Sequence, residues 1–240
     1  MKYILDSHTH TLASGHAYST IHEMAATAAK RGLELLGITD HSMKMPGSCH
    51  EFYFLNLHII ARKISGIEVM LGAEVNIMDY KGTVDMEEPL LKKMDVVIAS
   101  LHIPCIKPGN KEQNTAALLG VMKNPYVNII GHPDDSRYPI NYEALVLGAK
   151  EHGILLELNN NSLNPRGMRQ NPIPNDMILL ELCRKYRQPI ILGSDAHTQE
   201  EVGNHCYLDS LLETVHFPEE LIVNRSVEEY KKYINRYKFK

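Results

Sequence analysis

The chain has 240 residues, of which 44% are apolar and 22% charged, and this ordinary globular composition excludes disordered, collagen-like and coiled-coil proteins. The net charge of −4 and the lack of a long basic stripe argue against nucleic-acid binding. The length predicts one domain over residues 1–240, built as an α/β barrel or an open α/β sheet.

The start of the chain does not look like a targeting segment. Met1–Leu5 is followed at once by the polar residues Asp6 and His8, which leaves no signal-peptide core. No apolar run approaches the roughly 18 residues of a membrane span. The cysteines are scattered and form no Cys-x-x-Cys pair: Cys49, Cys105, Cys183 and Cys206. We therefore expect a cytoplasmic protein with reduced thiols and no membrane partner.

Short apolar runs recur along the chain, and most lack strict alternation of apolar and polar residues. This pattern predicts strands that are buried on both faces, as in a parallel sheet. The less regular stretch Leu71–Val84, with Asp79 and Gly82, is compatible with a hairpin. The seven runs are Tyr3–Leu5, Leu33–Thr39, Ile67–Ala73, Asp95–Ser100, Val127–Ile130, Ile154–Leu158 and Ile190–Leu192.

Helical signals lie between these runs. The apolar spacing over Ile21–Ala28 predicts a helix that Gly32 ends. Thr20 and Glu23 form a capping box at its start. Three further helices are predicted: one between Asn141 and Gly153, one over Met177–Tyr186 after a turn at Pro172–Asn175, and a last one capped by Ser226 with Glu229.

Strands that alternate with helices indicate an α/β fold. Seven strands, rather than eight, suggest an incomplete or distorted barrel. An open doubly wound sheet would give a similar pattern, and the pattern alone leaves both architectures open.

Ligand-type side chains follow the predicted strands. Six of the seven runs end in a histidine or a carboxylate, and the sixth ends in Asn159 and Asn160. In α/β barrels the ends of different strands build the active site at one face. We therefore expect nine residues to meet there: His8, His10, His16, His41, Glu74, His102, His132, Asp195 and His197.

These seven imidazoles and two carboxylates are too many for one metal ion. A catalytic zinc site usually takes three protein ligands and keeps one position open. The set therefore predicts two or three divalent ions with a carboxylate bridging them. Nitrogen and oxygen donors without a thiolate favour zinc, with manganese or iron as alternatives.

The order of these motifs resembles the PHP superfamily, named for polymerase and histidinol phosphatase domains. Its His-x-His matches His8 and His10, and its Thr-Asp-His matches Thr39-Asp40-His41. Its later single histidines match His102 and His132, and its Asp-x-His matches Asp195 and His197. The segments His16–Thr20 and Glu157–Asn160 resemble the small stand-alone bacterial phosphatases of the superfamily.

The resemblance implies a distorted (β/α)7 barrel with a trinuclear metal centre. It also implies how nine ligands would be shared. One metal would bind His8, His10, Glu74 and Asp195, a second would share Glu74 and bind His102 and His132, and the third would bind His16, His41 and His197.

The implied activity is hydrolysis of phosphomonoesters on a small phosphorylated substrate, with a metal-activated hydroxide as the nucleophile. Asp40, Glu74 and Asp195 are the expected catalytic carboxylates. Asp40 is expected to hold a ligand histidine through a hydrogen bond, and Asp6 to do the same. Substrate contacts are expected in the loop after the sixth strand or near His102, from Asn159, Asn160, Arg166, Arg169 or Lys107.

Other functions stay open at this point. An amidohydrolase-type enzyme that cleaves C–N or C–O bonds also has a barrel and a His-x-His, but it usually carries a carbamylated lysine where this chain has His102. A PHP-family phosphodiesterase or exonuclease, and an inactive metal-binding domain, are further alternatives. The physiological substrate and the oligomeric state cannot be read from the sequence.

Overall fold

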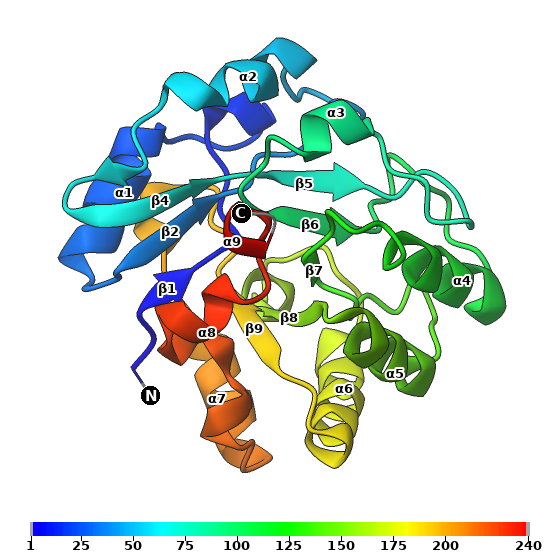
Figure 1. Cartoon of the computed structure of the whole chain (residues 1–240). Helices are drawn as coiled ribbons and strands as arrows, with labels where there is room; N and C mark the ends of the chain where they lie inside the picture. Colours follow the sequence, from blue (N-terminus) through cyan, green and yellow to red (C-terminus); the bar gives the residue numbers. More distant parts are fainter. Residues whose placement is uncertain (1, 239–240) are drawn as a thin grey trace.

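The computed structural model describes residues 2–238, and its strands lie inside a ring of helices (Figure 1). The strands are β1 (Leu5–Asp6), β2 (Leu35–Ile38), β3 (Lys63–Ile64), β4 (Ile67–Leu71), β5 (Ala73–Asn76), β6 (Val97–Ser100), β7 (Ile129–Ile130), β8 (Leu155–Asn159) and β9 (Ile190–Gly193). The helices are α1 (Ile21–Lys30), α2 (Glu51–Asn56), α3 (Glu88–Leu91), α4 (Lys111–Val121), α5 (Tyr142–His152), α6 (Pro172–Tyr186), α7 (Cys206–Thr214), α8 (Val227–Lys231) and α9 (Asn235–Lys238).

Two sheets form the inner layer. One sheet has the order β1-β2-β4-β3, and the other runs from β5 to β9 in chain order. All neighbouring strands are parallel except β3 and β4, which are joined by a tight turn at Ser65 and Gly66, both with positive φ. The predicted parallel α/β architecture is confirmed, and β3 is an antiparallel edge strand that the apolar runs did not predict.

The chain passes from one sheet to the other at Gly72, between β4 and β5. A Cβ atom there would lie 2.0 Å from the backbone oxygen of Val96, so only glycine fits. Beyond the strand ends, single parallel bridges connect the two sheets on both sides. These bridges pair His41 with Glu74 and Thr9 with Ala196. They bring the carboxyl ends of both sheets to one place.

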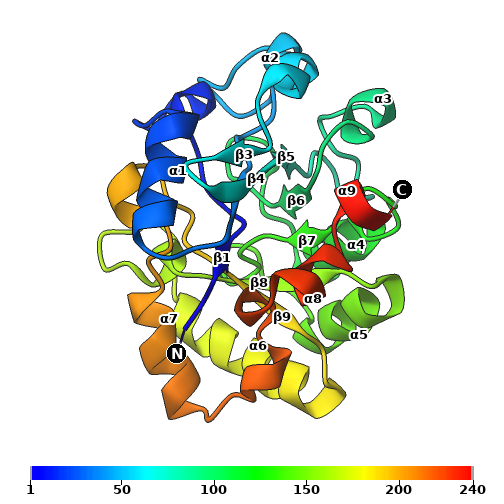
Figure 2. The same cartoon turned by 60° about the vertical axis from the view of Figure 1, so that its left-hand side comes forward.

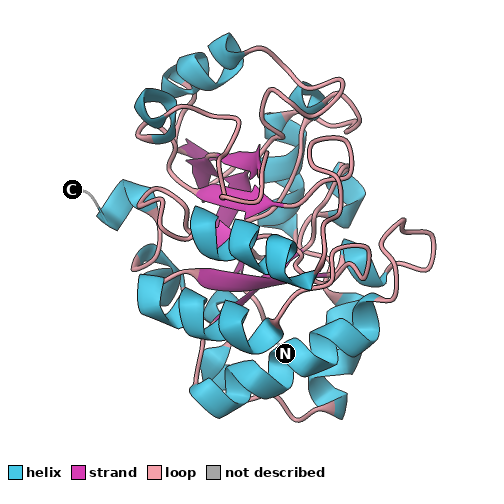
Figure 3. Cartoon of the chain, turned by 90° about the vertical axis from the view of Figure 1, so that its right-hand side faces the viewer, coloured by secondary structure: helices cyan, strands magenta, loops and turns pink. Residues whose placement is uncertain are grey.

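The C-terminal segment covers the opposite end of the strands. Tyr230 of α8 and the nearby Ile234 are fully buried. They pack against a separate apolar cluster that comes mostly from the starts of the strands: Leu5, Leu35, Met70, Val96, Ile98, Ile129, Leu155 and Ile191. Figure 2 shows α8 and α9 on this side, and Figure 3 shows long loops on the side away from the C-terminus. The apolar filling at one end leaves the carboxyl ends for polar side chains.

Most of the predicted helix ends are confirmed. The capping box of Thr20 and Glu23 is present at α1, and α5 begins after Asn141 and ends at Gly153 in the left-handed conformation. The Ser226 side chain accepts a hydrogen bond from the Glu229 N–H at α8. Residues 172–175 were predicted to form a turn, and this is wrong.

These residues instead form the first turn of α6, which begins at Pro172. A proline is well tolerated there, because the first N–H groups of a helix have no partner within the helix. The predicted hairpin within Leu71–Val84 has a counterpart in an antiparallel bridge between Ile77 and Val84. Within residues 2–238, no helix is long and apolar enough to cross a membrane.

Candidate metal centre

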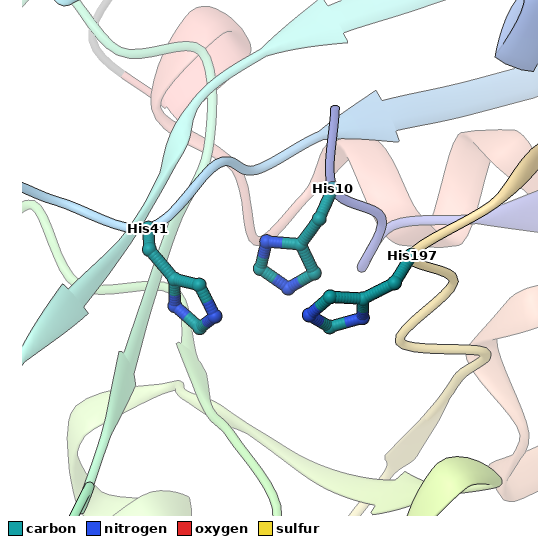
Figure 4. A group of neighbouring side chains, drawn as sticks. All are labelled: His10, His41 and His197. Carbon is teal, nitrogen blue, oxygen red and sulfur yellow. The ribbon is translucent and has the colours of Figure 1, made fainter. Parts of the chain in front are cut away.

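Residues predicted from the strand ends lie together at the carboxyl ends of the strands. Figure 4 shows three of them, His10 after β1, His41 after β2 and His197 after β9, with their imidazole rings pointing toward one another. The ring centroid of His10 is 4.2 Å from that of His41 and 4.5 Å from that of His197. Three segments that are far apart in the sequence therefore supply one cluster of imidazole nitrogens that could bind a metal ion.

The carboxylate of Glu74, on β5, is fully buried among the histidines. Its Oε1 atom is 2.8 Å from His132 Nε2 and 3.3 Å from His102 Nε2. Because its two oxygens face different rings, Glu74 has the geometry of a carboxylate that bridges two ions. The rings that face Oε2 are His41 (Nδ1 at 2.7 Å), His8 (Nε2 at 3.5 Å) and His10 (Nε2 at 3.6 Å).

The two oxygens of Asp195 also have separate partners. Oδ1 is 3.2 Å from His10 Nε2 and 3.7 Å from His8 Nε2, on the side of the cluster. Oδ2 accepts hydrogen bonds from Arg169 Nη2 at 3.2 Å and from Asn159 Nδ2 at 3.3 Å. Oδ1 of Asp195 is thus available to a cation, while Oδ2 is held by Arg169 and Asn159.

Both carboxylates are ionised at neutral pH. Burial raises the pKa of Glu74, but the charges of His102 and His41 outweigh it and leave the pKa well below its usual range. Burial raises the pKa of Asp195 in the same way, and His8 and other neighbours reverse the effect. Two ionised carboxylates inside the protein need a positive partner.

The surroundings shift the pKa values of His8 and His10 in opposite directions. Burial lowers the pKa of His8, but the carboxylates of Glu157 and Glu74 bring it well above its usual range. Burial lowers the pKa of His10 as well, and the neighbouring His41 and His197 lower it further. His10 is therefore neutral at neutral pH, as a metal ligand must be.

The donor set fits divalent ions. Among the described residues, the buried atoms His41 Nδ1 and Glu74 Oε2 have no hydrogen-bond partner, although they lie 2.7 Å apart. A cation between their lone pairs would satisfy both atoms. Four sets of three ligand atoms lie within 4.8 Å of one another: His10, His41 and His197; His8, His132 and Asp195; His8, His10 and Glu74; and His41, Glu74 and His102. The sets hold nitrogen and oxygen donors, which suits zinc, manganese or iron.

His16 lies at the outer edge of the cluster. Its ring stacks on those of His41 and His197, with centroid distances of 4.9 Å and 5.0 Å. The Tyr18 N–H donates to the backbone oxygen of His197 at 2.8 Å and so holds this segment against the site. Within residues 2–238, His16 belongs to none of the four sets, and its role as a ligand of a third metal stays a prediction.

The backbone is strained at two of these residues. His132 has a φ of 29° and Asp195 a φ of 54°, a region that non-glycine residues seldom occupy. His132 directly follows Gly131, and Asp195 lies two residues after Gly193. A Cβ on Gly131 would lie 2.2 Å from the Ser100 hydroxyl, and one on Gly193 would lie 1.9 Å from Glu157 Oε1. Both glycines therefore leave room for polar groups that support the cluster.

Glu157, on β8, supports two of the histidines. Its Oε1 is 2.6 Å from His8 Nδ1, and its Oε2 accepts the His132 N–H at 2.8 Å. A carboxylate on the far nitrogen of a ligand histidine fixes the ring and raises its basicity. Glu157 was not among the residues predicted for the site. Its position inside the otherwise apolar run Ile154–Leu158 is the feature of the sequence that could have indicated a role.

Two further polar side chains hold the cluster from β5 and β6. The Asn76 carboxamide oxygen is 2.7 Å from His102 Nδ1, so Nε2 of that ring faces Glu74. The Ser100 hydroxyl donates to Glu74 Oε1 at 2.6 Å. These contacts orient ligands in the manner expected around a metal site.

Asp40 is separated from His10 by Ser14 and accepts hydrogen bonds from four donor groups. Its Oδ1 accepts from the Thr11 N–H at 2.6 Å and the Ser14 hydroxyl at 2.7 Å. Its Oδ2 accepts from the Thr11 hydroxyl at 2.8 Å and the Tyr53 hydroxyl at 2.5 Å. Two acceptor sites on each oxygen are thereby filled. Asp40 reaches the ligand His10 only through Ser14, whose hydroxyl is 3.1 Å from His10 Nδ1.

Asp6 contacts backbone and hydroxyl groups. Its oxygens accept hydrogen bonds from the Ser194 N–H at 3.2 Å, the Ser194 hydroxyl at 2.5 Å and the Gly203 N–H at 2.8 Å. The His8 N–H is also within 3.4 Å. Asp6 therefore ties β1 to the segment after β9, next to Asp195, and does not contact an imidazole ring in these hydrogen bonds.

The predicted substrate residues are placed differently from one another. Asn159 contacts Glu157 and Asp195 inside the site. The Asn160 carboxamide oxygen instead accepts the N–H groups of Tyr207 and Leu208 at the start of α7, at 3.0 and 3.4 Å. The Asn160 oxygen thus caps the start of α7, and a substrate contact by its amide group stays a prediction.

Arg169 and Arg166 lie on the same loop but differ in burial. The Arg169 side chain is only 17% exposed and is paired with Asp195, and its neighbouring carboxylates raise its pKa despite burial. Arg166 is exposed, and its backbone N–H bonds to Asn164. Lys107 is also exposed. Of these cations, the structure brings Arg169 to the cluster.

Comparison with known proteins agrees with this architecture. The profile of the PHP domain family matches residues 6–238. The chain belongs to the PHP domain family. It is 48% identical over 234 residues to a probable phosphatase of Clostridium novyi (strain NT), covering 98% of this chain and 95% of that protein. It is 44% identical over 241 residues to a probable phosphatase of Thermoanaerobacter sp. (strain X514), covering 100% and 98%.

Solved structures share the fold at low sequence identity. Histidinol phosphate phosphatase from Lactococcus lactis, in complex with zinc, L-histidinol and phosphate, has a TM-score of 0.58 and 17% identity. The match covers 90% of this PHP chain and 95% of that chain. A chain in archaeal ribonuclease P with mature tRNA has a TM-score of 0.52 and 16% identity, with 98% and 88% covered. Because such different assemblies share the fold, function must be argued from the site.

Proposed function

We propose that this PHP-family protein is a metal-dependent phosphatase that hydrolyses phosphomonoesters at a trinuclear centre. The observation that carries the proposal is the pair of carboxylates, Glu74 and Asp195, buried within one cluster of histidines. The proposal includes a distorted (β/α)7 barrel as the architecture, one domain over residues 1–240, and a cytoplasmic location. The bridges between the two sheets beyond the strand ends support the barrel.

The proposed ligand sets follow the family assignment. Glu74 would be shared by the first two ions, because its two oxygens face different histidines. The sets are His8, His10, Glu74 and Asp195 for one ion, Glu74, His102 and His132 for a second, and His16, His41 and His197 for the third. Each of the four close groups among the described residues holds at least two members of one of these sets.

Divalent ions bound here would supply a low-pKa water and neutralise the charge that develops on a phosphoryl group. The protein's own contribution is to hold the ligands in place from the buried side. Glu157 fixes His8, Asn76 fixes His102, and Arg169 fixes Asp195. The guanidinium of Arg169 also provides planar donors at the cluster, which suit a phosphate oxygen.

A small phosphorylated substrate is part of the proposal. The Lactococcus lactis phosphatase of this fold was solved with L-histidinol and phosphate, which supports a small organic phosphate as the substrate class here. The end of β6 carries His102 at the position where an amidohydrolase-type site would carry a lysine. The phosphate-ester reaction is therefore the better supported of the two.

The first experiment measures metal content and phosphatase rate on the same sample. Protein purified without chelator is analysed for zinc, manganese and iron, and its rate is recorded with p-nitrophenyl phosphate. We expect two to three ions per chain and a rate that falls on chelation and returns with zinc or manganese. One ion or fewer, with no rate restored by either metal, would leave an inactive domain as the better interpretation.

A further inference from the structure

The Ser14 hydroxyl connects Asp40 to two ligand histidines. Ser14 ends a short 3-10 turn, Leu12–Ser14, and is fully buried. Its oxygen lies 2.7 Å from Asp40 Oδ1, 3.1 Å from His10 Nδ1 and 3.1 Å from the backbone nitrogen of His41. A hydroxyl carries one proton and two lone pairs, so these three contacts use its whole capacity.

The direction of each hydrogen bond can be worked out from Asp40. Four N–H and O–H groups point at its two oxygens, at distances between 2.5 and 2.8 Å. Asp40 Oδ1 accepts the Thr11 N–H, a group that can only donate, and it also accepts the Ser14 hydroxyl. The Ser14 proton therefore lies on the Asp40 side.

The other two contacts of Ser14 follow from this. The His41 backbone N–H can only donate, and it takes one lone pair of the Ser14 oxygen. The second lone pair faces His10 Nδ1, so that nitrogen must carry the proton of the contact. The reverse arrangement, with Ser14 donating to His10, would leave the Ser14 oxygen and Asp40 Oδ1 2.7 Å apart without the proton that joins them.

We propose that Ser14 is a positioning residue that holds His10 as the Nδ1–H tautomer and leaves its Nε2 as the metal-ligating atom. The surroundings of Nε2 agree with this, because it faces His8 Nε2 at 3.1 Å and Asp195 Oδ1 at 3.2 Å. The same hydroxyl binds the backbone of His41, so one side chain aligns ligands that follow two different strands. The inference rests on the proposed metal centre and not on the identity of the reaction.

The wild-type protein tests the tautomer directly. Long-range 1H–15N correlation spectra of the metal-free, 15N-labelled protein distinguish Nδ1–H from Nε2–H histidines, and a His10→Gln variant identifies the His10 signals. We expect His10 to be neutral with its proton on Nδ1. A proton on Nε2, or an even mixture of both tautomers, would overturn the inference. Because no metal or substrate is present, this result is independent of whether the protein proves to be a phosphatase.

Two serine variants, one at Ser14 and one control, test whether Ser14 affects metal binding. Ser14→Ala removes the acceptor for His10 and His41, and loss of such a supporting group typically costs about 10–100-fold in metal affinity. Ser19→Ala is the matched control: Ser19 is a buried serine on the same loop whose hydroxyl accepts the Gln199 N–H at 2.9 Å and contacts no ligand in the described hydrogen bonds. Zinc affinity is measured by competition with a chelating dye.

We expect about 10–100-fold weaker zinc binding at one site in Ser14→Ala and wild-type binding in Ser19→Ala. The Nδ1–H signal of His10 should also weaken in the first variant only. Wild-type zinc affinity with an unchanged His10 tautomer in Ser14→Ala would show that Ser14 does not position the ring. If Ser14→Ala does not fold, the tautomer in the wild-type protein still decides the question.

Discussion

Arg169 holds Asp195 from behind: its Nη2 lies 3.2 Å from Asp195 Oδ2, while Asp195 Oδ1 faces the histidines. The same guanidinium is close enough to the cluster for Glu74 to raise its pKa. This position allows Arg169 to support a ligand and to meet a phosphate oxygen. This contact with Asp195 distinguishes Arg169 from Arg166, whereas the sequence alone could not tell the two arginines apart.

Arg169→Ala should lower kcat/KM for p-nitrophenyl phosphate by about 10–100-fold, because a charge-assisted hydrogen bond contributes about 1.5–3 kcal/mol. Arg166→Ala, on the same loop but exposed, is the control and should change kcat/KM less than about twofold. Steady-state kinetics with zinc-loaded protein measure both. A large loss in Arg166→Ala with a small one in Arg169→Ala would reverse the assignment.

Removing a ligand should reduce bound metal and turnover together. In Asp195→Ala and His41→Ala we expect at least one ion fewer per chain and a fall in kcat of about 100-fold or more, with the fold retained. Elemental analysis and far-UV circular dichroism on the same samples make the measurement. Full activity in either variant would contradict the proposed ligand sets.

Glu157→Gln tests the support of His8 without changing the size of the side chain. The carboxylate is 2.6 Å from His8 Nδ1, and a neutral amide cannot provide the same charge. We expect zinc affinity to fall by about 10–100-fold. Glu23→Gln, an exposed capping residue at α1, serves as the control for the substitution itself. Equal zinc affinity in both variants would remove Glu157 from the site.

The loop that carries His16 packs closely against a second loop at Gly15 and Gly47. Gly15 has a φ of +81°, and a Cβ there would lie 1.9 Å from the Gly47 backbone oxygen. Gly15→Ala should therefore displace His16 and remove one ion while the others stay. Gly66→Ala is matched in backbone strain, with a φ of +88°, but has open space around its Cβ position. Metal content that is equal in the two variants would argue against His16 as a ligand.

Asp176 of α6 is a buried carboxyl with no hydrogen-bond partner among the described residues. Burial and the charge of Asp134 raise its pKa well above the ordinary 3.8, although Arg169 lowers it and Glu157 adds to the rise. A raised pKa in the folded state means that stability falls as pH rises from about 4 through the folded-state pKa.

Asp176→Asn should therefore stabilise the protein at pH 8, by about 1–3 kcal/mol, and have little effect near pH 4. Urea unfolding of metal-free protein at both pH values measures the difference. Glu200→Asn, which removes an exposed carboxylate, is the reference. An effect of the same size at both pH values would contradict the assignment.

The sequence by itself determined which residue types meet at one end of the strands. Histidines and carboxylates follow the apolar runs in a fixed order, and parallel strands bring their carboxyl ends to one edge, so the cluster of these side chains could be predicted from the sequence alone. The helix caps at Thr20 and Asn141 were also predictable, because a cap depends only on residues within one turn of it.

Only the tertiary structure decided which side chains touch. Adjacent residues of a strand point to opposite sides, yet nothing local says which side faces the site, so Asn159 and Asn160 could not be told apart. Arg166 and Arg169 share one loop, and loop geometry depends on contacts with distant residues. Glu157 gained its role from His8, which is 149 positions away in the chain. Contacts of this range follow from how the strands pack around the site, and local sequence patterns carry no information about them.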